Sequence, residues 1–378
     1  MNRNKAVFVA ATGQHIGKTT TCLAIVAGAE QLLGKGNIGF MKPVGQRHVI
    51  VDNGLKVDKD VVLFKSHFNM FKCNYQDMSP VVIPSGYTRN FLDGKITEYD
   101  QIAAVERAFQ SISSQHTFTV VEGTGHCGVG SIVNLDNARV ASILGLNMLL
   151  VVNGGLGSAF DELSLNRLAC LNQGVEIKGV IINKVHPDKL DMIKDYFSRA
   201  LARWNIPLLG VVPDGPYLSQ PSMLDFEELF KTKLLSGLPE RLRHYDAITL
   251  VAMDLRTFAK RLHTERSSRT LFVTHASRLD ILMSFISHAK LHEEVHGEPF
   301  TAALILAGVG DLDDFDRKIV QDLIQNQARP MLFSDKSTYE TMLAISHYTA
   351  KLSANDPKRT SKAVEHYVPH LDMRKIVQ

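Results

Sequence analysis

The most informative segment of this chain is Thr12-Gly13-Gln14-His15-Ile16-Gly17-Lys18-Thr19. It follows directly on a short apolar run at 6–12 and opens a segment of helical period at 18–33, so the order is strand, glycine-containing loop, helix. Free backbone amides and the helix dipole favour a negative charge at such a helix start. The sequence therefore predicts a phosphate-binding loop, and the alternative of a glycine turn that binds nothing fits this setting less well.

Individual residues of this loop suit the phosphates and metal of a nucleotide. Gly17 allows the backbone to wrap a phosphate, Lys18 reaches the terminal phosphates, and Thr19 offers a hydroxyl to Mg²⁺. The common G-x-x-x-x-G-K-T spacing has glycine at the position of Thr12. We predict that ATP and Mg²⁺ are the cofactors and that the nucleotide contacts Thr12, Gly13, Gln14, His15, Ile16, Gly17, Lys18, Thr19 and Thr20.

Two carboxylates are candidates to complete a metal site with Thr19. Glu122 closes the apolar strand expected at 118–122, where a buried charge is expensive unless it has a partner. Asp60 lies in the segment Asp58-Lys59-Asp60-Val61, and a solvated surface acid is the alternative for it. Because Mg²⁺ that bridges phosphates is typically held by one or two carboxylates, we predict Thr19, Asp60 and Glu122 as its ligands.

Lys42 precedes Pro43 at the end of a second apolar strand, expected at 38–44. The carboxyl ends of parallel strands meet at one edge of a sheet, so this cation is expected at the same crevice as the phosphate loop. There it would clamp an anionic substrate or a transferring phosphoryl group, whereas a solvated lysine is the alternative. Lys18 and Lys42 are therefore the predicted catalytic residues.

The order of elements predicts an α/β fold with a doubly wound, mostly parallel sheet. Up to residue 214, short β-branched runs alternate with longer segments of helical period, which is typical of βαβ units. Ligands of such sheets bind outside the carboxyl ends of the strands. We expect strands at 6–12, 38–44, 118–122, 148–153, 179–183 and 208–212, and helices at 18–33, 99–113, 136–144, 159–172 and 187–202.

A domain boundary is expected at Pro213-Asp214-Gly215-Pro216, where turn formers interrupt this alternation. We predict a first domain at 1–215 and a second, smaller α/β domain at 216–378. The tail from Asp356 keeps apolar residues at helical spacing and is expected to dock as a helix. Strands of the second domain are expected at 233–235, 247–252, 271–274, 303–306 and 331–333.

Composition excludes several classes of protein. The 378 residues carry a formal charge of 42 − 39 = +3, with 45% apolar and 21% charged residues, which is an ordinary globular balance without a basic field for nucleic acid. No apolar run reaches the length of a membrane span, and the first residues do not resemble a signal peptide, so we expect a cytoplasmic protein. The four cysteines show no C-x-x-C spacing, which argues against disulfides and a cysteine zinc site.

The segment His292-Glu293-Glu294-Val295-His296 spells H-E-x-x-H, a pattern that places two imidazoles on one helix face for zinc. We interpret the match as accidental. His288 and Ser284 continue the same stripe as a polar face toward water, and Gly297 ends the helix without an obvious third ligand.

Taken together, these motifs resemble the dethiobiotin synthetase family of P-loop proteins, and especially the related domain at the front of some bacterial phosphate acetyltransferases. The resemblance covers the first domain. It implies that Lys18 and Thr19 handle ATP phosphates and Mg²⁺, Asp60 and Glu122 hold the metal, Lys42 faces the substrate and Asn183 contacts the adenine. It rests on Ala11 to Thr19, Lys42-Pro43-Val44, Val121-Glu122-Gly123, Gly179-Val180-Ile181-Ile182-Asn183 and Leu209-Gly210-Val211-Val212-Pro213.

The second domain resembles, more weakly, the DRTGG domain that follows this module in those acetyltransferases. The likeness rests on Leu304-Ile305-Leu306-Ala307-Gly308 and on the segment from Pro330 to Thr341. Where that family has an Asp-Arg pair, this chain has His275-Ala276-Ser277-Arg278, so the resemblance does not extend to a ligand role there.

Two departures in the first domain bear on the substrate. Dethiobiotin synthetases continue the Lys-Pro motif into a Ser-Gly turn, whereas Gly45-Gln46-Arg47-His48 follows here, and His126 replaces a usual glycine. The resemblance thus implies that nucleotide chemistry is retained but that specificity for the biotin precursor is not. Arg47 and His48 suit an anionic acceptor better than a diamine.

Two functional interpretations stay open. The first is an ATP-dependent ligase-type enzyme, or an ATPase, that activates a carboxylate or carbamate by phosphorylation. The second is a nucleotide-responsive regulatory protein without a substrate of its own, acting through the second domain. We expect a nucleotide and an anionic small molecule as ligands, no nucleic-acid or membrane partner, and a homodimer.

Overall fold

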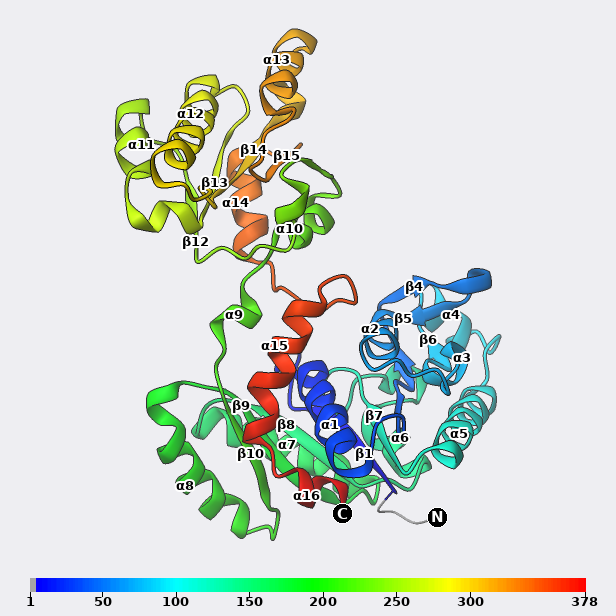
Figure 1. Cartoon of the computed structure of the whole chain (residues 1–378). Helices are drawn as coiled ribbons and strands as arrows, with labels where there is room; N and C mark the ends of the chain where they lie inside the picture. The colour runs from blue at the N-terminus through cyan, green and yellow to red at the C-terminus, as the bar shows by residue number, and fades with distance from the viewer. Residues whose placement is uncertain (1–4) are drawn as a thin grey trace. The chain divides into compact units, whose positions relative to one another are not determined.

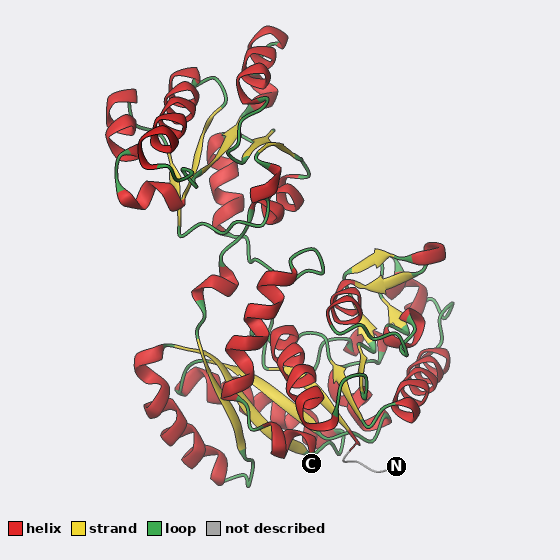
Figure 2. Cartoon of the chain, in the orientation of Figure 1, coloured by secondary structure: helices red, strands yellow, loops and turns green. Residues whose placement is uncertain are grey.

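The computed structural model describes residues 5–378, and the chain folds into two compact units. The first unit runs to Gly215 and takes in Leu352–Gln378 as well, while Pro216–Lys351 form the second. Figures 1 and 2 trace both along the chain. The chain leaves the first unit where turn formers interrupt the alternation of strands and helices, and it returns to that unit near its end.

A six-stranded parallel sheet forms the first unit, in the order β10-β9-β8-β1-β7-β2. β1 lies inside the sheet, with β7 and β2 on one side and β8, β9 and β10 on the other, so right-handed crossovers in both directions place helices on both faces. This arrangement confirms the predicted doubly wound α/β fold. The strands are β1 (Ala6–Ala11), β2 (Ile38–Met41), β7 (Phe118–Glu122), β8 (Met148–Asn153), β9 (Ile177–Val185) and β10 (Leu208–Pro213).

Helices connect these strands and cover their apolar side chains. Every residue of β1 is buried, as expected for a central strand with a neighbour on each side and helices on both faces. The helix that follows it, α1, packs against β1, β2 and β7. The connecting helices are α1 (Lys18–Leu33), α5 (Glu98–Gln115), α6 (Asn137–Ile143), α7 (Gly157–Asn172) and α8 (Leu190–Ala202).

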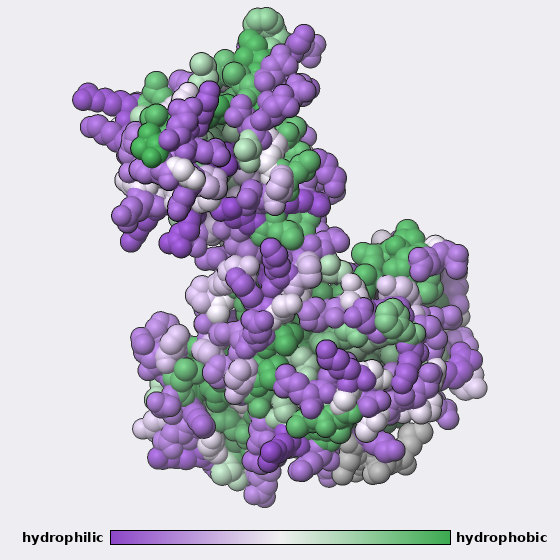
Figure 3. All heavy atoms as spheres, in the orientation of Figure 1, coloured by the Kyte–Doolittle hydropathy of each residue, from purple (hydrophilic) through white to green (hydrophobic). Residues whose placement is uncertain are grey.

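Between β2 and α5 the chain forms a small layer that the sequence pattern did not reveal. β3 (Val44–Gly45) pairs with β6 (Val81–Val82), and β4 (His48–Ile50) forms an antiparallel hairpin with β5 (Lys56–Asp58). Strands of two or three residues are too short to show a period. Exposed apolar side chains of this hairpin form a visible patch in Figure 3: Val49, Ile50 and Leu55. The helices of the layer are α2 (Lys59–His67), α3 (Tyr75–Met78) and α4 (Tyr87–Leu92).

The second unit is a smaller α/β layer structure around a sheet of order β11-β15-β14-β13-β12, in which only the β11–β15 pairing is antiparallel. One apolar core joins the sheet to α11, α12 and α13, and the other joins it to α10 and α14. Its strands are β11 (Leu234–Ser236), β12 (Ala247–Leu250), β13 (Thr270–His275), β14 (Ala303–Ala307) and β15 (Met331–Ser334). Its helices are α9 (Pro216–Ser219), α10 (Met223–Phe230), α11 (Leu255–Leu262), α12 (Leu279–His296), α13 (Asp314–Ile324) and α14 (Thr338–Ser346). Across residues 5–378, no helix has the length and apolar character needed to cross a membrane.

The C-terminal tail docks as helices on the first unit, so the expected range 216–378 for the second domain needs correction at 352–378. Helix α15 (Pro357–Tyr367) packs against α1, and Met373 of α16 (Met373–Val377) fills space beside Gly28, where a Cβ would lie 2.7 Å from Met373 Cγ. The helical period shows that one face of the tail is buried, but it does not show which unit supplies the covering surface.

Docking of the tail should contribute to the stability of the first unit. Ile376 on α16 is fully buried, so Ile376→Ala is expected to lower the free energy of unfolding by about 2–4 kcal/mol. Urea unfolding followed by fluorescence of Trp204, the single tryptophan of the chain, reports on this unit. The matched control is Arg374→Ala on the same helix, where the side chain is exposed. Equal small effects of both substitutions would show that the tail does not stabilise the unit.

Candidate nucleotide and metal site

The phosphate-binding loop lies between β1 and α1, and its backbone depends on Gly17. This residue has a φ of 100°, a left-handed conformation that side chains rarely adopt. A Cβ here would also lie 2.2 Å from Asn183 Nδ2. The positive φ and the close approach therefore both require glycine.

The residues predicted to bind nucleotide differ in their burial. Thr12 and Ile16 are buried, and the Thr12 hydroxyl donates to Glu162 Oε2 at 3.2 Å, so these two side chains brace the loop from within. The other predicted residues are accessible to a ligand. Gln14 and His15 are exposed, and Gly13, Gly17, Lys18, Thr19 and Thr20 are half-buried.

Asn183 of β9 lies directly against the loop. Its side chain is fully buried, and Nδ2 donates to the carbonyl of Ile16 at 2.6 Å. The hydroxyl of Tyr367 on α15 lies beside the same point, 3.3 Å from where a Cβ of Gly17 would be, and burial raises the pKa of Tyr367 to about 12. The structure thus joins Asn183 to the loop backbone, and its contact with adenine stays a prediction.

Lys18 opens α1 and turns its ammonium toward the loop after β7. Its Nζ donates to the carbonyl of Gly125 at 3.1 Å. Burial lowers the pKa of Lys18, although the nearby charge of Glu122 opposes the shift. An added anion such as a phosphate would favour the charged form of this side chain.

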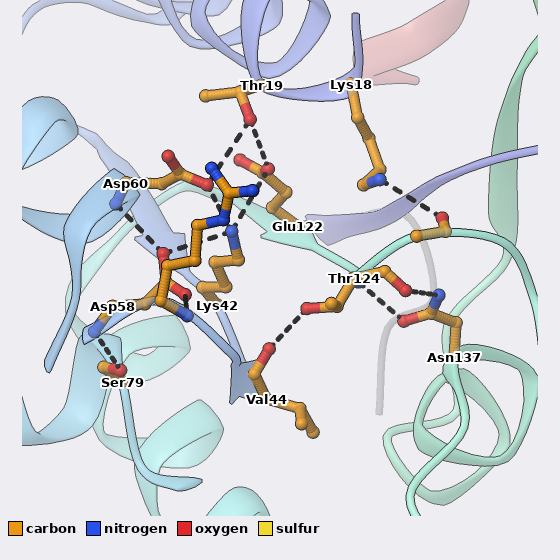
Figure 4. A network of polar contacts seen from close by, with 12 residues as sticks. Lys18, Thr19, Lys42, Val44, Asp58, Asp60, Ser79, Glu122, Thr124 and Asn137 are labelled. Atoms are coloured by element: carbon orange, nitrogen blue, oxygen red, sulfur yellow. Dashed lines mark hydrogen bonds and ion pairs between the residues drawn. The ribbon is translucent and has the colours of Figure 1, made fainter. Parts of the chain in front are cut away.

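Four ionisable side chains meet beside the loop, and we call Lys42, Asp58, Asp60 and Glu122 the charged cluster (Figure 4). Lys42 Nζ pairs with Asp60 Oδ2 and lies 3.2 Å from Asp58 Oδ1 and 3.7 Å from Glu122 Oε1. The Thr19 hydroxyl donates to Glu122 Oε1 at 2.8 Å and lies 3.4 Å from Asp60 Oδ2. The structure therefore brings the three predicted metal ligands together with Lys42.

Burial and the neighbouring charges together set the pKa values of the charged cluster. Burial raises the pKa of Glu122 to about 7, against the attraction of Lys42. Burial alone would lower the pKa of Lys42, but the charges of Asp60, Glu122 and Asp58 raise it well above its ordinary value. The ammonium is thus charged at neutral pH. Glu122 Oε2 is buried without a hydrogen-bond partner, which leaves one oxygen for a further ligand.

Asp58 is a member of the cluster that the sequence motifs did not reveal. It caps α2, because its Oδ1 accepts a hydrogen bond from the backbone N–H of Asp60 at 3.0 Å, and its Oδ2 accepts from that of Arg47 at 3.4 Å. Aspartate before a helix is a visible capping signal. The hairpin that brings this cap to Lys42 has no comparable signal.

A second polar network ties the loop after β7 to the loop after β2 (Figure 4). The Thr124 hydroxyl donates to the carbonyl of Val44, and the Thr124 backbone N–H donates to Asn137 Oδ1 at 2.9 Å. Asn137 Nδ2 donates in turn to the carbonyls of Thr124 and His126. These bonds fix the two loops that flank the charged cluster, and sequence reasoning missed both Thr124 and Asn137.

The charged cluster fits a Mg²⁺ ion that also binds phosphate. Within residues 5–378, no group of three or more His, Cys, Asp or Glu side chains is arranged to hold a metal by itself. Magnesium in nucleotide sites needs fewer, because phosphates and water complete its coordination. Thr19, Asp60 and Glu122 offer a hydroxyl and two carboxylates, one of them with an unpartnered buried oxygen.

Fold and site together define a P-loop nucleotide-binding protein, since a central parallel strand leads through a glycine loop into a helix that begins with Lys18 and Thr19. Residues 5–222 match the AAA_26 model, described as an AAA domain. The chain belongs to this family.

Named relatives include phosphate acetyltransferases and dethiobiotin synthetases. The chain is 24% identical over 98% of its length to a phosphate acetyltransferase of Nitrosomonas europaea, and it spans 51%, about half, of that protein. Over 56% of its length it is 24% identical to the ATP-dependent dethiobiotin synthetase BioD of Brachyspira hyodysenteriae, of which it covers 93%. The resemblance predicted for the P-loop domain is confirmed, whereas the likeness of the second domain to the DRTGG domain stays a prediction.

Among solved structures, the MinD cell division protein of Aquifex aeolicus is similar, with a TM-score of 0.33 and 14% identity over 57% of this chain and 84% of that chain.

The H-E-x-x-H segment lies on α12 and contributes to no metal-holding group within the part of the chain that the structure describes. His288 does not simply face water, as the polar stripe suggested. It is half-buried and lines a pocket of about 400 Å³ with His263, His292 and His296. Burial, with the neighbouring His263, lowers the pKa of His288, which favours the neutral form of that ring.

Stability should depend on pH through Glu122. Its pKa rises from an ordinary value of 4.5 to about 7 on folding, so the folded state holds the proton more tightly than the unfolded state. The free energy of unfolding is then expected to fall as pH rises from about 4.5 through 7, because the folded state must carry a buried charge. Glu122→Gln should remove this part of the pH dependence.

Urea unfolding of the parent and of Glu122→Gln at several pH values between 5 and 8 measures the difference. The two stability curves should diverge across this range, with the parent losing more. Parallel curves would show that Glu122 does not titrate there.

Proposed function

We propose that the chain is a MgATP-dependent enzyme that transfers the terminal phosphoryl group of ATP to a carboxylate or carbamate. The observation that supports this proposal most is the position of Lys42, a buried ammonium at the end of β2 beside Thr19 and the two candidate metal ligands. Phosphoryl transfer gains from fixed positive charge near the transferring group. Nucleotide binding alone would not require a second buried lysine.

The positions of the other site residues indicate what each would do in phosphoryl transfer. The amides of the loop and Lys18 would bind the phosphates at the start of α1. Thr19, Asp60 and Glu122 would hold Mg²⁺, which neutralises charge on the phosphates when it is bound. An acceptor oxygen would then attack the terminal phosphorus while ADP leaves, with Lys18 and Lys42 stabilising the spreading negative charge.

An anionic acceptor is the substrate class that the surroundings favour. Arg47 and His48 are exposed and lead from the end of β3 into the β4–β5 hairpin. The backbone N–H of Arg47 donates to Asp58, which anchors this loop beside the charged cluster. Dethiobiotin synthetases have a small Ser-Gly turn at this point, which leaves room for a diamine. Here Arg47 adds a positive charge, which repels ammonium groups and attracts carboxylates.

A nucleotide-responsive regulatory protein is the second candidate, and the course of the chain favours it. The second unit is inserted between β10 and α15, and His366 of α15 bonds to the carbonyl of Pro213 at the end of β10 at 2.9 Å. Tyr367 of the same helix lies beside Gly17. The helix that follows the insertion therefore contacts both the end of the strand before the insertion and the phosphate loop. Hydrogen exchange within Pro216–Lys351 that responds to MgATP, without turnover for any acceptor in a metabolite library, would favour this candidate.

Lys18→Ala should weaken MgATP binding at least tenfold, because it removes a charged hydrogen bond to phosphate worth about 1.5 kcal/mol or more. Isothermal titration calorimetry measures the affinity. Lys35→Ala is the matched control, since Lys35 is an exposed lysine beyond the far end of α1. If Lys18→Ala binds MgATP as tightly as the parent, the loop is not the phosphate site.

Dethiobiotin should not be formed at a useful rate. A like charge and the bulk of Arg47 oppose a diamine with ammonium groups. The assay supplies diaminopelargonate, bicarbonate and MgATP and follows both ADP and dethiobiotin. Turnover near 1 s⁻¹ or so, with one dethiobiotin per ADP, would make this a biotin-forming enzyme and would contradict the proposed acceptor class.

A further inference from the structure

We propose that Lys42 occupies the place of the metal when no nucleotide is bound, and that Asp58 receives the lysine when Mg²⁺ arrives with ATP. This inference rests on the proposed function and adds an order of binding to it: the metal enters only together with the nucleotide.

The first step concerns which oxygens the lysine uses. The Thr19 hydroxyl contacts Glu122 Oε1 at 2.8 Å and Asp60 Oδ2 at 3.4 Å. Lys42 Nζ contacts the same two oxygen atoms. The ammonium thus lies between the two carboxylates that, with the Thr19 hydroxyl, form the predicted ligand set of Mg²⁺. A divalent ion that binds Oε1 of Glu122 and Oδ2 of Asp60 beside the Thr19 hydroxyl must displace the ammonium, since two cations would compete for the same negative charge.

The second step concerns where the lysine goes. Asp58 Oδ1 lies 3.2 Å from Lys42 Nζ, and Asp58 is not among the predicted metal ligands. Its side chain is 2% exposed and is held by the backbone N–H groups of Asp60 and Arg47, so it cannot readily follow the metal. The ammonium can therefore leave Asp60 and Glu122 and still keep a buried carboxylate partner, which a buried charge requires.

The third step concerns the balance of charge. Without a nucleotide, the buried carboxylates are compensated by Lys42, and a metal ion alone would have to displace it. ATP adds negative phosphates beside the cluster, which favour both the metal and Lys18. Lys42 would thus control the entry of the metal before it acts on the substrate. Asp58 would be a positioning residue, because it affects the metal only through Lys42.

Mn²⁺ alone is the probe for this exchange, because its free ion gives an electron paramagnetic resonance signal that binding removes. In the full chain without nucleotide, Lys42→Met should bind Mn²⁺ at least tenfold more tightly than the parent. Lys184→Met is the matched control: this exposed lysine lies near the phosphate loop, where its Nζ donates to the His15 carbonyl, but outside the charged cluster. We expect Lys184→Met to bind Mn²⁺ as the parent does, and only Lys42→Met to bind it more tightly.

Asp58→Asn tests the second half of the proposal. In the presence of ATP it should weaken Mn²⁺ binding in the parent, where the lysine has lost its second partner, but it should have no further effect in the Lys42→Met background. Loss of the same size in both backgrounds would show that Asp58 acts on the metal directly.

The proposal is overturned if nucleotide-free Lys42→Met binds Mn²⁺ no more tightly than the parent and the Lys184→Met control do. If Lys42→Met folds poorly, Lys42→Gln replaces it, and Mn²⁺ should then raise the Tm of that variant but not of the parent. Calorimetry with MgATP on the parent separates the two ideas. Binding by the parent without a gain in the variants overturns the exchange alone, whereas no binding by the parent overturns the proposed function.

Discussion

A carboxylate buried at the end of a strand constrains the whole site. Glu122 closes β7 with 1% of its surface exposed, and a charge buried there needs partners. Thr19 at the start of α1 and Lys42 at the end of β2 supply them, so elements on either side of β7 must meet at one point. Removing one partner would leave another charge uncompensated, which is why the phosphate loop and the loop after β2 keep fixed places.

The buried carboxylate of Glu122 also connects nucleotide binding with the proposed phosphoryl transfer. In the proposed function, the P-loop would supply amides and Lys18 for phosphates, and the charged cluster would supply oxygens for a metal and a second ammonium for an anion. The AAA_26 model matches residues 5–222, which leaves out the tail of the first unit. The chain spans about half of the acetyltransferase relative from Nitrosomonas europaea. The second unit is built into the middle of the first through β10 and α15. Its role is therefore best sought in how it affects the loop that α15 touches.

The main sheet could be predicted from the sequence, because its buried strands and long helices show clear hydrophobic patterns. Helix α1 also begins at Lys18, as the loop motif requires. That Thr19, Glu122 and Lys42 lie close together was also predictable, since each closes or opens an element at one sheet edge, whereas the helix that carries Asp60 was not expected. Their role as ligands of a metal and a substrate stays a prediction. The rest depended on tertiary contacts. Asp58 reaches the cluster through a hairpin of three-residue strands, Asn183 donates to the backbone of the loop, and the tail packs on the first unit. Neither a hydrophobic period nor a motif spacing encodes these contacts.

The proposed function rests on one claim, that Glu122 would hold a metal together with the nucleotide. Calorimetric titration of ATP into the parent and into Glu122→Gln, each in Mg²⁺ and in EDTA, tests it most directly. The claim predicts that the substitution weakens binding at least tenfold in Mg²⁺ and changes it little in EDTA. Equal losses in both conditions would contradict it and would assign Glu122 a structural role beneath the phosphate loop.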